Sequence, residues 1–169
     1  LTIADKSGAT RPVHGYIRQI EQLHTATRFT HYRCELVPRF WFLGKNSDHR
    51  IFQGKSVIEI IETILKEQMF TEKDFSFKCF NKYEPREYCV QYSESDLHFI
   101  SRLCEEEGIF FYFDHSEEAH CMCFCDMPGG PSIPGESELR YLPGPGMLEE
   151  TAVINQLRVR HSINSDAAE

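Results

Sequence analysis

The stretch REYCVQYSESDLHFISRLCEEEGIFFYF, residues 86–113, carries in order the signals for a strand, a helix and a second strand. Ser93 followed by Asp96 has the spacing of a helix N-cap with an acidic N3 residue, so we expect a helix to begin there. The helix should run to about Glu107, because Gly108 stands where a left-handed residue commonly ends a helix. Its apolar stripe is formed by Leu97, Ile100, Leu103 and Cys104.

The sequence around this stretch predicts a second helix and further strands. Ser56 and Glu59 form a capping box, and apolar residues at helical spacing then predict a helix over residues 57–68. Four strands are expected, at residues 75–80, 86–92, 109–113 and 121–125. The last two are apolar at successive positions and are joined by a turn at 114–119, which predicts that they pair and are covered on both faces.

The two ends of the chain have weaker patterns. Residues 13–23 and 29–37 predict a hairpin, residues 38–44 either a helical turn or a strand, and residues 45–50 a polar loop. Towards the C-terminus we expect a loop at 127–136, a short strand at 139–142, a Pro-Gly boundary at 143–146, a strand at 151–161 and a polar tail at 162–169.

Composition excludes several classes of protein. The chain has 169 residues, of which 41% are hydrophobic and 26% charged, which is typical of a folded domain. Its net charge of -8 disfavours binding to nucleic acid, because phosphate backbones repel an acidic surface. Apolar runs are far shorter than the roughly 20 residues of a membrane-spanning helix, and the start of the chain does not read as a signal peptide. Seven cysteines, an odd number, favour reduced thiols in a cytosolic compartment.

The stretch HCMCFCD, residues 120–126, is the first candidate for a chemical site. On a strand, Cys121, Cys123 and Cys125 share one face and lie about 7 Å apart. Thiolates around one zinc ion must lie within about 4 Å of each other, so a metal site is disfavoured and we predict no cofactor. A metal-binding module remains an alternative, which stoichiometric zinc in the purified protein would support.

No pattern in the chain indicates an enzyme. Neighbouring residues of the run Glu105, Glu106 and Glu107 diverge by about 100° on a helix, so they cannot face each other as a glycosidase pair does. The eight histidines are scattered, and the sequence contains no nucleophile elbow, phosphate loop or dinucleotide fingerprint. We therefore predict no catalytic, cofactor-binding or metal-binding residues, although a hydrolase domain stays as a less favoured alternative.

The block at residues 86–113 strongly resembles the VgrG family of type VI secretion spike proteins, which are related to contractile phage tail hubs. The resemblance extends from about Arg11 to His161 and includes His14-Gly15, the segment 32–41 with Trp41, and the segment 52–61. Three features depart from the family pattern, namely His98 at a usually acidic position, Cys104 at a larger apolar position, and the cysteines of residues 121–125.

The resemblance implies an α+β fold in which a small α/β unit, with two helices and several strands, is inserted between two hub β-barrels. On that basis residues 1–50 belong to the first barrel, 51–146 form the insertion and 147–169 begin the second barrel. Strands of both barrels and the spike would then lie outside this chain. Open strand edges predict that the 169-residue piece alone is poorly stable or self-associates.

The resemblance also implies function and partners. The expected role is mechanical: a homotrimeric hub stacks on a hexameric Hcp-like tube, carries spike-tip and effector proteins, and transmits thrust. Such a protein would assemble in the cytoplasm and leave through the type VI machine. The run at residues 105–107 would then face an interface or the pore. A hub of a prophage contractile tail is the nearest alternative.

Overall fold

The computed structural model describes residues 1–4, 8, 10–25, 29–127, 140–141, 153–154 and 159. The chain divides into two compact units, Leu1–Gly130 and Pro131–Glu169. In the second unit, β10 (Arg140–Tyr141) and β11 (Val153–Ile154) pair in parallel. Each falls inside a predicted strand, whereas the loop at 128–136, the boundary at 143–146 and the tail lie outside the described residues. The three-domain division at residues 50 and 146 stays a prediction.

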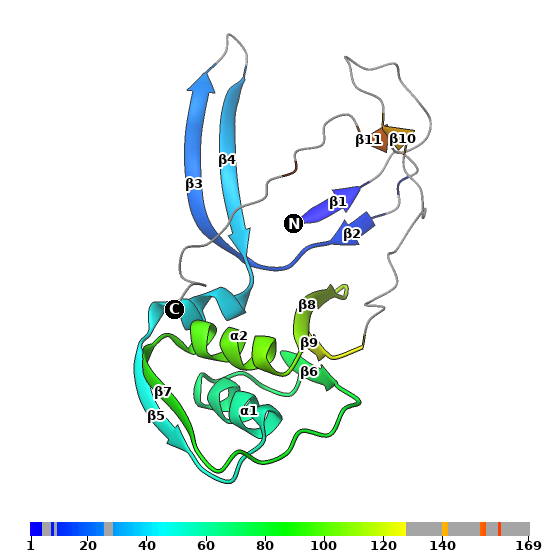
Figure 1. Ribbon diagram of the computed structural model, residues 1–169. Helices are drawn as coiled ribbons and strands as arrows, with labels where there is room; N and C mark the ends of the chain where they lie inside the picture. The colour runs from blue at the N-terminus through cyan, green and yellow to red at the C-terminus, as the bar shows by residue number, and fades with distance from the viewer. Residues whose placement is uncertain are drawn as a thin grey trace. The chain divides into compact units, whose positions relative to one another are not determined.

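The first unit is mixed α+β, as predicted (Figure 1). It begins with two antiparallel pairs, continues through a 3-10 helix, and then alternates strands with two helices. The elements are β1 (Thr2–Ala4), β2 (Thr10–Pro12), β3 (Tyr16–Thr25), β4 (Thr30–Val37), η1 (Arg39–Lys45), β5 (Asp48–Phe52), α1 (Val57–Glu67), β6 (Phe75–Lys78), β7 (Cys89–Glu94), α2 (Asp96–Glu106), β8 (Phe110–His115) and β9 (His120–Cys125). The described residues contain no closed barrel, and within them no helix is long and apolar enough to cross a membrane.

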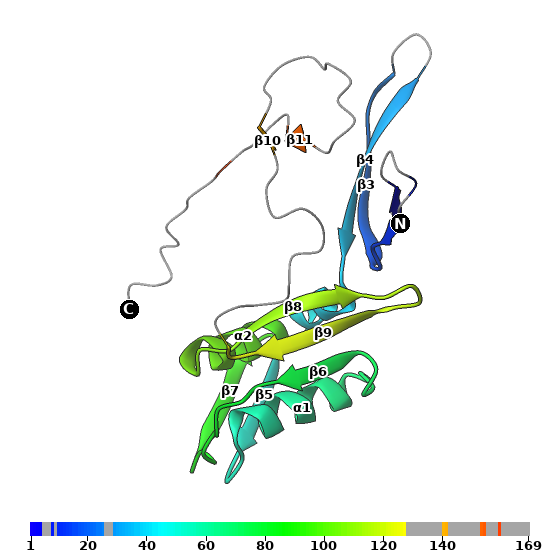
Figure 2. The ribbon, with the colours of Figure 1, turned by 90° about the vertical axis from the view of Figure 1, so that its right-hand side faces the viewer.

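The core lies around the two helices, which Figures 1 and 2 show between the β5–β7 pair and the three-stranded sheet β6–β9–β8. Phe52 contributes to the core from the first sheet, and Phe75 and Phe124 from the second. The capping box of α1 is confirmed, because Ser56 Oγ accepts from the Glu59 amide at 3.4 Å and Glu59 Oε2 accepts from the Ser56 amide at 2.8 Å.

The start of α2 differs from the prediction by two residues. Its N-cap is Ser95, whose Oγ accepts from the His98 amide at 3.2 Å, and not Ser93. Ser93 stays in β7, with a positive φ of 52°, because the ladder to β5 extends to Glu94. Asp96 is therefore the first residue of the helix and does not cap it.

The stripe predicted for α2 is largely correct, but Phe99 is fully buried and Leu97 only partly so. Gly108 has a φ of +68°, which confirms it as the left-handed residue after the helix.

The predicted polar loop at residues 45–50 is wrong for its second half, which belongs to β5. The strand pairs with β7, a partner more than thirty residues away, so no local pattern reveals it. Its polar residue Arg50 points inward to a buried carboxylate, which hides the usual apolar alternation. For residues 38–44 the helical alternative is correct, since η1 buries Phe40 and Leu43.

The pairing of β8 with β9 is confirmed, and β9 also pairs in parallel with β6. Cover on both faces is correct for β9, where Met122, Cys123, Phe124 and Cys125 are buried. It is wrong for β8, where no residue is fully buried and Phe110 stays 38% exposed.

Candidate functional site

The antiparallel ribbon formed by β3 and β4 is largely exposed to solvent. The predicted hairpin is confirmed, and all ten residues of β3 are exposed. Two register shifts, between Ile17 and Gln19 and between Gln22 and His24, change which residues share a face. Such shifts explain why the sequence of β3 lacks clean alternation.

The register gives the ribbon two unlike faces. Ile17 lies opposite Leu36, Ile20 opposite Cys34 and Gln22 opposite Tyr32, and we call this side the apolar ribbon face. Ile17, Ile20 and Tyr32 are 58%, 61% and 60% exposed. The other side carries ion pairs from Arg18 to Glu35 at 2.6 Å and from Arg33 to Glu21 at 3.1 Å.

A two-stranded ribbon is marginal in water, and a contiguous exposed apolar surface marks an interaction site. The apolar ribbon face is therefore a candidate interaction surface of the described chain.

The base of the ribbon is packed closely against η1. A Cβ on Gly15 would meet the Val37 carbonyl oxygen at 2.8 Å, so only glycine fits this crossing. Tyr16 contacts Phe42 edge to face, with ring centroids 5.5 Å apart. The root of the ribbon is thereby fixed to the helical part of the same unit.

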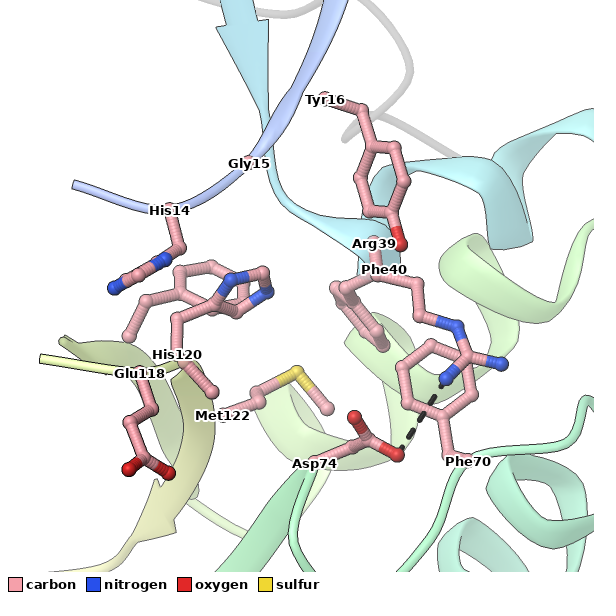
Figure 3. A pocket seen from close by; sticks show the side chains of 12 residues that line it. His14, Gly15, Tyr16, Arg39, Phe40, Phe70, Asp74, Glu118, His120 and Met122 are labelled. Carbon is pink, nitrogen blue, oxygen red and sulfur yellow. Dashed lines mark hydrogen bonds and ion pairs between the residues drawn. The ribbon is translucent and has the colours of Figure 1, made fainter. Parts of the chain in front are cut away.

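A cavity of about 270 Å³ opens beside this root (Figure 3). On one side Arg39 lies 4.4 Å above the Phe70 ring, donates to the Met69 carbonyl at 2.8 Å and forms an ion pair with Asp74 at 3.4 Å. Burial opposes the charge of Asp74, but hydrogen bonds from Thr71 and the charge of Arg39 outweigh it and lower the pKa of the carboxyl. The polar groups of this wall satisfy one another, so they do not define a ligand.

His14 and His120 lie on the other side of the cavity in Figure 3. His115 completes this group, with its ring 6.1 Å from that of His14 and 5.7 Å from that of His120. His14 is about a hundred residues from the other two, so the sequence pattern could not bring the three together. The sequence indicates only that His115 and His120 lie close to the same predicted turn.

Asp96 is the centre of a buried polar network that joins the two helices to β5. It is fully buried and accepts from Gln91 at 2.8 Å and Gln68 at 2.9 Å, and also from Asn46 and Arg50. Burial disfavours its charge, yet these donors outweigh burial and lower the pKa of Asp96 below its ordinary range. Such a network specifies how helix and strand pack, which is a structural role.

The thiols of Cys121, Cys123 and Cys125 lie along one face of β9, as predicted. On that face Lys78 of β6 donates to the Tyr112 hydroxyl of β8 at 3.1 Å, and this contact crosses the central strand above the thiols. Cys123 is 2% exposed and acts as a small buried residue. Within the described part of the chain, no group of three or more His, Cys, Asp or Glu side chains is arranged to hold a metal ion.

The acidic run at the end of α2 has an internal partner that the sequence did not suggest. Arg86 donates to Glu106 and to Glu107, both at 2.7 Å, and so offsets the unfavourable helix dipole. Glu106 also pairs with Arg102 at 2.9 Å, whereas Glu105 is exposed.

Comparison with known proteins identifies relatives across the whole chain. Residues 1–169 match the family described as phage tail baseplate hub (GPD). The chain is 46% identical over 114 residues to the type VI secretion system spike protein VgrG4b of Pseudomonas aeruginosa, covering 68% of this chain and 14% of that protein. It is 39% identical over 150 residues to VgrG5 of the same organism, covering 88% of this chain and 19% of that protein.

A solved structure gives the same result. The E. coli c3393 protein is described as a type VI secretion component with structural similarity to the T4 bacteriophage tail proteins gp27 and gp5. It aligns with a TM-score of 0.65 and 29% identity over 84% of this chain and 38% of that protein. The chain thus spans less than a quarter of the two spike proteins it matches, and the resemblance predicted from sequence is confirmed. Since the family match covers every residue, the chain belongs to the phage tail baseplate hub family.

Proposed function

We propose that this chain is part of the hub of a puncturing spike in a type VI secretion system. The observation that carries the proposal is the match of all residues to the baseplate hub family, together with spike proteins of that system at 46% and 39% identity. In this role the hub is a homotrimer that stacks on a hexameric Hcp-like tube. Its work is mechanical, transmitting thrust to spike-tip and effector proteins, without catalysis.

The apolar ribbon face supports an assembled state. In the proposed hub, β3 and β4 are strands of the first barrel, residues 51–146 form the insertion, and residues 147–169 begin a second barrel. Barrel closure would cover Ile17, Ile20 and Tyr32 and would satisfy the free edges of the ribbon. The protein would assemble in the cytoplasm and leave through the secretion machine.

A hub of a contractile phage tail is a second candidate. The family description names a phage tail baseplate hub, and the aligned E. coli protein is described as similar to T4 tail proteins. The mechanical role is the same in both cases. Purification of the native assembly separates them, because a phage hub copurifies with tail and capsid proteins.

A matched pair of substitutions tests the proposed assembly. Ile20→Lys charges the apolar ribbon face, whereas Gln19→Lys puts the same charge on the opposite face one residue away. In the full-length protein, Ile20→Lys should abolish trimers in analytical ultracentrifugation and abolish secretion, and Gln19→Lys should retain both. Normal trimers and secretion with Ile20→Lys would refute the role of this face.

A further inference from the structure

Two hydrogen bonds attach the segment before β3 to the β8–β9 hairpin. The backbone amide of His14 donates to Nδ1 of His115 at 3.1 Å. The ring of His14 reaches the same hairpin, where Nε2 donates to the Ser116 carbonyl at 2.9 Å. The rings of His14 and His115 are stacked with an angle of 18° between their planes.

A third imidazole lies against this contact. His120 is paired directly with His115 in the β8–β9 register, and its ring packs edge to face on Phe113 with centroids 5.9 Å apart. Three imidazoles are thereby gathered where the N-terminal segment meets the hairpin. Imidazole is the side chain whose ordinary pKa lies nearest to neutral pH.

The direction of the hydrogen bond to His115 makes it sensitive to protonation. Nδ1 can accept the His14 amide only while it carries no proton, so the bonded form of His115 is neutral. A proton on Nδ1 would set one N–H against another and break the bond. Charge on His14 or His120 would add repulsion, although a charged His14 ring could still donate to Ser116.

We propose that His14, His115 and His120 form a pH-sensitive latch, which holds the segment before β3 on the β8–β9 hairpin at neutral pH and releases it in mild acid. The histidine latch is a property of this chain and does not depend on the proposed function. It would allow the preceding β1–β2 pair to change its attachment, while Tyr16 keeps the root of the ribbon on η1 and the core around α1 and α2 stays folded.

The charges around the latch act in both directions. Arg11 repels a proton on His115, Asp114 attracts one, and Asp74 attracts one on His120. Glu118 and Arg39 also line the adjoining cavity, and Lys73 lines a smaller one together with His115 and His120. Burial is the largest influence on both rings. With repulsion from His14 on both rings and from His120 on His115, it lowers the pKa of His115 and of His120.

The lowered pKa values of His115 and His120 set the direction in which pH changes the latch. A histidine whose pKa is lowered by folding favours the latched state above its ordinary value of 6.5. That stabilisation is lost as the pH falls below 6.5 and through the lower pKa of the latched state. For each unit by which the pKa is lowered, the latch equilibrium changes by about tenfold.

The latch is tested by amide exchange of His14, measured by NMR on the whole 169-residue chain at pH 7.5 and 5.5 and corrected for intrinsic exchange. Protection of the His14 amide should fall in acid, by up to about tenfold from titration of His115 alone. The Val13 amide, which donates to the Leu1 carbonyl within the same segment, is an internal reference that should not change. His115→Asn keeps an acceptor but cannot titrate, so its loss of His14 protection in acid should be much smaller, and any remainder comes from charge on His14 and His120.

A second histidine pair provides the matched control. His24 and His31 stack in the ribbon with centroids 4.3 Å apart, away from the latch. His24→Asn should retain the acid-induced loss of protection at His14. Equal loss in His115→Asn, or no loss in the unaltered chain, would overturn the latch.

If His115→Asn disturbs the hairpin at both pH values, the unaltered chain still decides. NMR titration of the His115 ring should coincide with loss of His14 protection. Protonation of His115 while the His14 amide stays protected would overturn the proposal.

Discussion

Helix α1 has 11 residues and strand β3 has 10, but α1 buries its apolar side chains and β3 exposes them. Five residues of α1 are fully buried, whereas all ten residues of β3 are exposed. Both contain isoleucines, four in α1 and two in β3, but those of β3 are exposed. The α/β part of the first unit encloses its own core, and the ribbon presents an apolar face that another surface must cover.

The largest effect is expected from a matched isoleucine pair. Ile61 is fully buried in α1, so Ile61→Ala should lower the free energy of unfolding by about 2–5 kcal/mol. Ile20 is 61% exposed, so Ile20→Ala should change it by less than about 0.5 kcal/mol in the isolated chain. Urea denaturation of both variants measures the difference. A large loss with Ile20→Ala would show that the ribbon is already packed.

Removal of the buried charge at Asp96 should have the next largest effect. Asp96→Asn loses charged hydrogen bonds to Arg50 and the glutamines and should cost about 2–3 kcal/mol at pH 7. Because folding lowers the pKa of Asp96, its contribution is present above about pH 4, its ordinary range, and is lost as the pH falls through the lower folded value.

Denaturation at several pH values should therefore show a smaller gap between Asp96→Asn and the unaltered chain in acid. Asp48→Asn is the control, because Asp48 is a half-buried partner of the same arginine, whereas Asp96 is fully buried. A gap that does not shrink in acid would contradict the charged state of Asp96.

A smaller effect distinguishes two serines at the start of α2. Ser95→Ala removes the N-cap and should cost about 1 kcal/mol, whereas Ser93→Ala removes no cap. Ser93→Gly should be neutral or slightly stabilising, because glycine tolerates the positive φ at this position. Thermal denaturation checks the order. If Ser93→Ala destabilised the protein more than Ser95→Ala, Ser93 would be the N-cap, as predicted from sequence.

The smallest effect on folding concerns the exposed end of α2. Glu105→Gln should leave the free energy of unfolding within about 0.5 kcal/mol, since its side chain is exposed. Glu105→Gln, Glu106→Gln and Glu107→Gln combined would also disturb Arg86, so Glu105→Gln alone is the cleaner test of an interface. Unchanged trimers and secretion with this variant would remove the expected interface role of Glu105.

Sequence predicted the features that depend on nearby residues. The capping box at Ser56, the left-handed Gly108 and the paired strands β8 and β9 all follow from short-range patterns. Strand β5 was missed because its inward-facing residue is the polar Arg50. Arg50 forms an ion pair with Asp96, which lies far along the chain.

The same limit applies to the sites. His14 meets His115 across a hundred residues, and Arg86 reaches Glu106 and Glu107 across about twenty. Neither pairing leaves a local pattern in the sequence. The two faces of the ribbon were hidden as well, because register shifts beside Ile17 and Gln22 interrupt the alternation.

Hydrogen exchange, compared between the dilute monomer and the assembled full-length protein, tests the central contrast most directly. In the monomer, amides of β3 and β4 should exchange at least about a hundredfold faster than those of α1 and α2, because the ribbon opens without disrupting the core. Assembly should slow exchange in the ribbon and leave the helices nearly unchanged. Equal protection of ribbon and helices in the monomer, or no added protection on assembly, would contradict the account.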